Sequence, residues 1–267
     1  MRIVRLLTIV AAGLAMSSSV VAEHHQEGAC VDYGPQTPRD IDSAIGENQR
    51  LFSVAPGYAD MNLCNIHFHV NAEHKAADYS IAAEPTADGH SGGYKCNLST
   101  ALTAEELTEP AENHCKDIRP GDTIEVHWVF SSCAVTPGEG LGSCLSDKCA
   151  NPDLRVEAQV FTVVNDAAAV NFASLAYGGH VADGLHQPKS LPSDTGDPVV
   201  FLGSTTGPKY TEAKCSPLQV TWSVRPKCAK IDMNSLSTWC KSNVFNEDHA
   251  HGVRELVVNP ALLSEIK

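Results

Sequence analysis

The chain has 267 residues, a formal net charge of −13 and 43% hydrophobic residues. This acidic balance, without any long basic run, excludes nucleic acid and anionic membrane surfaces as expected partners. The length suits one large β-rich domain with its own core.

The first 22 residues have the pattern of a secretory signal peptide. Arg2 and Arg5 form a short basic region, residues 6–16 are apolar, and small residues at 20–22 suit cleavage. The apolar run is too short to span a bilayer, and no other stretch is long enough for a membrane helix. We therefore expect residues 1–22 to be removed and residues 23–267 to form one exported domain, secreted or periplasmic, without membrane contact after cleavage.

The expected mature chain contains an even number of cysteines. In an exported protein this pattern predicts disulfides, and the chain has no Cys-x-x-Cys motif to favour a thiolate metal site. The sequence alone does not determine how they pair. The ten are Cys30, Cys64, Cys96, Cys115, Cys133, Cys144, Cys149, Cys215, Cys228 and Cys240.

A predicted strand over residues 62–71 carries the main chemical signal of the chain. Side chains alternate between the faces of a strand, so Asn65, His67 and His69 share one face, whereas Ile66 and Phe68 face the core. Two imidazoles side by side on a stiff strand form a ready bidentate metal site. A carboxylate follows at Glu73, which is a candidate ligand or partner.

Residues 123–130 predict a second strand, rich in β-branched and aromatic residues. Its alternation places Glu125, His127 and Val129 on one face. His127 is then the natural third ligand beside His67 and His69, and Glu125 could orient a ligand imidazole from behind. Three imidazoles that leave a fourth position open are typical of a catalytic zinc site.

The sequence pattern of the remaining chain predicts several strands and little helix. Strands are expected at 154–164, near 200–203 and at 215–224, with a short helix near 234–241. Residues 102–111 have helical composition, with Thr103 and Glu106 in a capping-box arrangement. We interpret His249 and His251, which have acidic neighbours, as a solvated or structural pair.

Several motifs together resemble a carbonic anhydrase. Residues 67–74 (His-Phe-His-Val-Asn-Ala-Glu-His), followed by Glu-Val-His-Trp at 125–128, resemble the delta class specifically. Other segments are similar to the alpha class and occur in the same order: Gln-Thr-Pro-Arg-Asp-Ile at 36–41, Gly-Ser-Thr-Thr at 203–206 and Val-Thr-Trp at 220–222. The matches are scattered over residues 30–225.

The resemblance implies a fold and an activity. The fold would be β-dominated (α+β): one domain with a large twisted, mostly antiparallel, alpha-carbonic-anhydrase-like sheet and few short helices. The activity would be the zinc-dependent reversible hydration of carbon dioxide to bicarbonate and a proton by a zinc-bound hydroxide. The expected partners are therefore these small molecules alone.

The resemblance also assigns roles to residues. The zinc ligands would be His67, His69 and His127, with Asn65 and Glu125 behind them. Glu73 would hold the hydroxyl of a gatekeeper threonine, which would be Thr205 or Thr206 because the Gly-Ser start of the turn matches. The turn lacks one residue and an insertion separates it from the Val-Thr-Trp strand, so counting back from Cys215 suggests Thr211 instead. Val129 and Trp222 would line the carbon dioxide pocket, and Cys30 would pair with Cys215.

The resemblance leaves the proton carrier unassigned. The alpha class often has a histidine before the first ligand strand, and residues 42–64 contain none. His74 and His90 are substitutes between which the sequence does not decide.

Two other functions fit parts of the sequence. His67-x-His69-x-x-x-Glu73 and the Pro-Gly-Asp at 120–122 resemble the motifs of a cupin, in which Glu73 would be a ligand and the chemistry oxygenase or isomerase. An exported binding protein that kept the fold without activity is the other alternative. The additional alpha-class motifs favour carbonic anhydrase over the cupin.

Overall fold

A computed structural model describes residues 28–30, 32–85 and 92–267. The expected signal peptide and His90 lie outside these residues. The described elements are η1 (Tyr58–Asp60), β1 (Asn62–Val70), β2 (Ile81–Ala82), β3 (Tyr94–Lys95), η2 (Asn97–Ala101), β4 (Thr123–Ser131), η3 (Leu141–Cys144), β5 (Leu154–Val164), η4 (Phe172–Ser174), β6 (Val181–Ala182), β7 (Leu185–His186), β8 (Val199–Ser204), β9 (Gln219–Val224), β10 (Ala229–Asp232), α1 (Met233–Lys241) and η5 (Pro260–Leu262).

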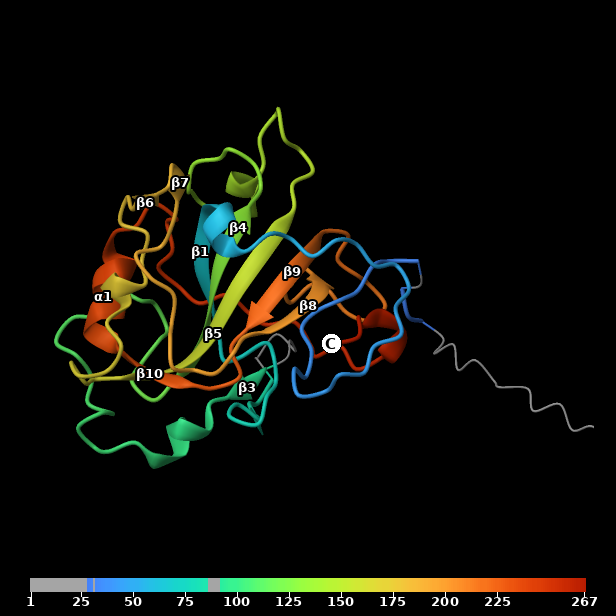
Figure 1. Cartoon of the computed structure of the whole chain (residues 1–267). Helices are drawn as coiled ribbons and strands as arrows, with labels where there is room; N and C mark the ends of the chain where they lie inside the picture. Colours follow the sequence, from blue (N-terminus) through green and yellow to red (C-terminus); the bar gives the residue numbers. More distant parts are fainter. Residues whose placement is uncertain (1–27, 31, 86–91) are drawn as a thin grey trace, which may run out of the picture.

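Six of the strands form one twisted sheet (Figure 1). Five of them follow the order β1-β4-β5-β9-β8, and the sixth, β10, pairs with the C-terminal part of β5. The pairs β1–β4, β4–β5 and β8–β9 are antiparallel, whereas β9 and β10 both run parallel to β5. The expected β-dominated fold with few helices is confirmed. The sheet is mixed because β9 and β10 both pair parallel with β5. The eleven residues of β5 give room for these two strands one after the other.

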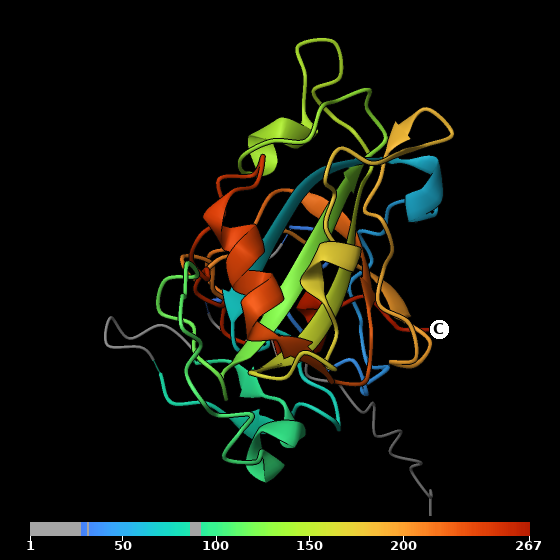
Figure 2. The ribbon, with the colours of Figure 1, turned by 90° about the vertical axis from the view of Figure 1, so that its left-hand side faces the viewer.

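Strand alternation gives this sheet two different faces. On one face, Phe68 and Trp128 belong to a large core beneath α1, which contributes Leu236 and Trp239. Figure 2 shows α1 lying across this face. On the other face, Val129 and neighbouring apolar residues form a second core. The histidines of β1 and β4 project from this second face, so the fold separates the α1 core from the polar site.

The helix predicted over residues 102–111 is absent. Its capping box does form, because Thr103 N donates to Glu106 Oε2 at 2.9 Å and Glu106 N donates to Thr103 Oγ1 at 3.2 Å. Only turns follow. Pro110 lacks a backbone N–H and disfavours helical geometry in the residue before it, so the cap has too few residues to propagate into.

Five disulfides join all ten cysteines: Cys30–Cys215, Cys64–Cys144, Cys96–Cys228, Cys115–Cys240 and Cys133–Cys149. The pairing implied for Cys30 and Cys215 is therefore present. The C-terminal segment lies beside the described N-terminal segment (Figure 1), where Gln36 N donates to Leu262 O at 2.7 Å. Among the described residues, no helix has the length and apolarity needed to cross a bilayer.

Candidate metal centre

The register of two neighbouring strands brings the three predicted ligands together. In the antiparallel pair β1–β4, His67 lies directly opposite His127, and His69 lies opposite Glu125. Directly opposed residues share a face, so the His-x-His of β1 and the single histidine of β4 converge. The side-chain donor nitrogens of His67, His69 and His127 all lie within 4.8 Å of one another.

The distance between two of these nitrogens fits a tetrahedral ion. His67 Nε2 and His127 Nδ1 are 3.3 Å apart. Two ligands of a tetrahedral zinc ion with bonds of about 2.0–2.1 Å lie about 3.3–3.4 Å apart. His69 Nε2 is buried and has no hydrogen-bond partner among the described residues. A buried polar atom without a partner needs an explanation, and a metal ion at this point would supply one.

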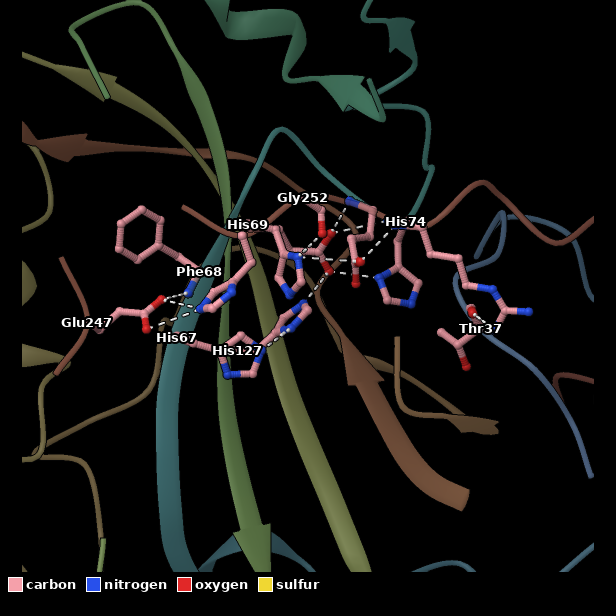
Figure 3. Close-up of polar contacts among 12 residues, drawn as sticks. Thr37, His67, Phe68, His69, His74, His127, Glu247 and Gly252 are labelled. Atoms are coloured by element: carbon pink, nitrogen blue, oxygen red, sulfur yellow. Dashed lines mark hydrogen bonds and ion pairs between the residues drawn. The ribbon is translucent and has the colours of Figure 1, made fainter. Parts of the chain in front are cut away.

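Each ligand histidine is oriented through its other ring nitrogen, and Figure 3 shows this for His69 and His127. His67 Nδ1 is 2.6 Å from Asn65 Oδ1, and His69 Nδ1 is 3.1 Å from the carbonyl oxygen of Gly252. His127 Nε2 is 3.1 Å from Glu125 Oε1. These acceptors hold the proton on the outer nitrogen, which leaves the inner nitrogen with a free electron pair for a metal ion.

Burial keeps the three imidazoles uncharged. It lowers the pKa of His67 well below its usual range, lowers that of His69 to about 4 and lowers that of His127 as well. The neighbouring histidines add to the effect at His67. Neutral imidazole is the form that binds metal, so the site is prepared for an ion at neutral pH.

Glu125 connects the ligand His127 with the backbone and side chain behind it. One of its oxygens accepts from the backbone N–H groups of Glu73 (2.7 Å) and His74 (3.1 Å), and the other accepts from His74 Nδ1 (2.7 Å) and His127 Nε2. Burial raises the pKa of Glu125, but the contacts with His74 and His127 outweigh it and lower the pKa well below its usual range. The buried carboxylate is therefore ionised.

Glu73 stands behind the ligands and not among them. Its Oε1 lies 3.4 Å from His69 Nδ1, the nitrogen turned away from the three-histidine cluster, and accepts from the backbone N–H of Arg254 at 3.2 Å. This position does not fit the cupin interpretation, which needs Glu73 as a ligand. Burial raises the pKa of Glu73, while the nearby side chain of Thr206 lowers it. Among the described residues, Glu73 Oε2 has no hydrogen-bond partner within the normal distance.

The two candidate gatekeeper threonines have different surroundings. Both line the cavity in front of the histidines. The Thr205 hydroxyl lies 2.5 Å from Ser216 Oγ, whereas the Thr206 side chain interacts with Glu73. Thr211, the third candidate, receives backbone and side-chain bonds within its own turn and is not part of the cavity lining.

A cavity of about 600 Å³ opens in front of the three histidines. One wall is apolar and includes the two predicted pocket residues, Val129 and Trp222, together with Leu141, Val156 and Val220. Trp222 is fixed by a 2.9 Å bond from its Nε1 to Ser204 O, and its ring lies 5.0 Å from that of His127. An apolar wall beside a polar centre suits a small apolar substrate.

The cavity lining also includes polar residues whose role the sequence did not reveal. His249 and His251 both line the cavity, so they are not merely a solvated pair. A parallel bridge joins His251 to His69, and Glu247 lies 3.0 Å from His251 Nε2. The hydrogen bond to Glu247 raises the pKa of His251. A second His-x-His was the available signal, but nothing local to it indicated that this segment lies beside β1.

One comparison with known proteins identifies the family of the chain. A family model for delta carbonic anhydrase matches residues 58–235. A search of curated protein sequences found no match. Among solved structures, an alpha-carbonic anhydrase from Photobacterium profundum is 20% identical over 85% of this chain and 88% of its own, with a TM-score of 0.28, too low to carry an argument. The family match covers most of the chain and includes both histidine strands, and we conclude that the protein belongs to the delta carbonic anhydrase family.

Proposed function

We propose that His67, His69 and His127 hold the zinc ion at which this carbonic anhydrase hydrates carbon dioxide reversibly to bicarbonate and a proton. One observation carries the assignment: three neutral donor nitrogens converge within 4.8 Å, and one of them is buried without a hydrogen-bond partner in the described part of the chain. When bound by three imidazoles, zinc acts as a Lewis acid and lowers the pKa of a water ligand to about 7, a magnitude already known from carbonic anhydrase itself.

The surrounding side chains hold and orient the reactants. Asn65 and Glu125 fix the rings of His67 and His127, so the inner nitrogens stay aimed at one point. Asn65 is itself fixed, since its Nδ2 donates to Gly138 O at 3.0 Å. Positioning of this kind is expected to affect the affinity for metal more than the chemical step.

Thr206 is the gatekeeper that we propose for the attacking water. Its hydroxyl can donate to the carboxylate of Glu73, which leaves only acceptor electron pairs facing the cavity. Thr206 would then accept a hydrogen bond from the water molecule at the centre and so orient it towards the substrate. The bond between Thr205 and Ser216 leaves Thr205 poorly placed for this task.

The apolar wall of Val129, Val156 and Trp222 is the proposed site for carbon dioxide. Carbon dioxide has no net dipole and gains little from polar groups, whereas bicarbonate is charged and is better solvated by water. The wall therefore favours the substrate in the hydration direction and the departure of bicarbonate.

We also propose that the domain acts outside the cytoplasm after removal of residues 1–22. Five disulfides support an oxidising compartment. Mass spectrometry of the mature protein, recovered from the medium or periplasm, should find an N-terminus at residue 23.

The ligand assignment is tested with His127→Ala. The variant should lose both stoichiometric zinc and carbon dioxide hydration, while His114→Ala, a surface histidine paired with Glu112, should keep both. Full activity in His127→Ala would overturn the assignment. Stoichiometric zinc without hydration in the wild type would instead support the inactive binding protein.

A further inference from the structure

The reaction itself requires a route for protons. Each turnover converts one carbon dioxide and one water into one bicarbonate and one proton, and this proton must leave a cavity lined largely by apolar and neutral groups. His74 cannot carry it to solvent, because the residue is fully buried and its Nδ1 is held by Glu125 at 2.7 Å.

A row of histidine rings leads from the metal centre to the surface along the cavity lining. The ring of His251 lies 5.5 Å from that of His67, and the ring of His249 lies 5.3 Å from that of His251, measured between centroids. Exposure increases outward: the side chain of His251 is 43% exposed and that of His249 is 55% exposed. His249 thus faces both the cavity and bulk water.

The backbone and a carboxylate hold His249 in place. Its segment forms a parallel bridge with Lys116, whose N–H donates to Asp248 O at 2.7 Å. His249 Nδ1 lies 2.9 Å from Asp248 Oδ1, and Lys116 Nζ lies 2.6 Å from the other oxygen of the same carboxylate. With Nδ1 bound to Asp248, His249 Nε2 has no protein partner among the described residues.

We propose that His249 carries the proton of the hydration reaction from the cavity to bulk solvent. His249 Nε2 accepts the proton from a water chain in the cavity and then releases it to a buffer base outside. The water chain can bridge the distance, so the proposal needs no change in the protonation of His251, whose ring contacts two metal ligands. The proposal rests on the metal site described above.

The charges around His249 suit this exchange. Asp248 stabilises the imidazolium, Lys116 opposes it from the neighbouring segment, and His251 faces it from the metal side with Glu247 behind. Imidazole is the side chain most often used to transfer protons in enzymes.

The test is the variant His249→Gln, which keeps a polar side chain but cannot carry a proton. Stopped-flow hydration assays in dilute buffer should show kcat falling about tenfold to a hundredfold, while kcat/KM stays within about twofold. Only kcat includes proton release after bicarbonate has formed. Added imidazole should restore kcat, and the control His114→Gln should match the wild type with or without imidazole.

A measurement apart from activity completes the test. Zinc content should be unchanged in His249→Gln. The proposal is wrong if kcat in dilute buffer is unchanged, or if kcat and kcat/KM fall together without rescue by imidazole. A wild-type protein without zinc or hydration would instead refute the proposed metal site.

Discussion

Replacing Glu125 by glutamine tests the network that holds the metal centre. The carboxylate accepts four hydrogen bonds, two on each oxygen. A glutamine has a single acceptor oxygen, and its NH₂ group would face two donors. Two buried donors therefore lose their acceptor, at a cost of about 1–3 kcal/mol each. We expect Glu125→Gln to lower the free energy of unfolding by about 2–6 kcal/mol.

The same substitution should weaken metal binding. The His127 ring loses the acceptor that fixes its orientation, and changes of this kind typically reduce metal affinity about 10- to 100-fold. Denaturant unfolding with the disulfides intact measures the first effect, and zinc competition with a chelator of known affinity measures the second. The matched control is Glu157→Gln, a buried glutamate on the opposite face of the sheet, held by Arg155, Ser223 and Arg225.

Glu157→Gln should reduce stability but leave zinc affinity unchanged.

The lowered pKa of Glu125 also makes the stability of the folded protein depend on pH. Because that pKa is lowered in the folded protein, its stabilising effect is complete above the unfolded value of about 4.3 and is lost as the pH falls towards the folded value. The difference in stability between wild type and Glu125→Gln should therefore narrow below about pH 4. Unchanged zinc affinity in Glu125→Gln would refute the role of this residue as a positioning group.

Three further results are expected. Thr206→Val should lower kcat/KM about 10- to 100-fold by removing about 1.4–2.7 kcal/mol of positioning, whereas valine at the neighbouring threonine should cost only stability; equal losses of activity would refute the assignment. Calorimetry at pH 6 in two buffers should show fewer protons released when zinc enters the metal-free site than the about 2.3 that three imidazoles with ordinary pKa values near 6.5 would release, because burial lowers the pKa values of the ligand histidines. Removing the Cys64–Cys144 disulfide, which closes 80 residues, should cost about 4.5 kcal/mol, against about 3.1 kcal/mol for Cys133–Cys149, which closes 16; unfolding measurements that reverse this order would contradict the chain-entropy explanation.

Local patterns in the sequence were enough to predict β1 and β4, the two strands that carry the candidate metal ligands. A strand repeats every two residues, so the common face of His67 and His69 follows from their spacing alone. The bounds expected for the two histidine strands and for residues 154–164 agree with the structure within a residue or two. The prediction of a helix at 102–111 was wrong, because a capping box indicates where a helix can begin and not whether it continues.

Only the tertiary structure decided how distant segments meet. The register that sets His67 opposite His127 joins residues 60 positions apart, and the segment of His249 and His251 reaches β1 from more than 180 positions away. The interactions of Thr205 and Thr206 likewise depend on Ser216 and Glu73, which no local period connects to them. The sequence thus determined which side chains share a strand face, whereas packing between elements determined which of those faces meet around the cavity.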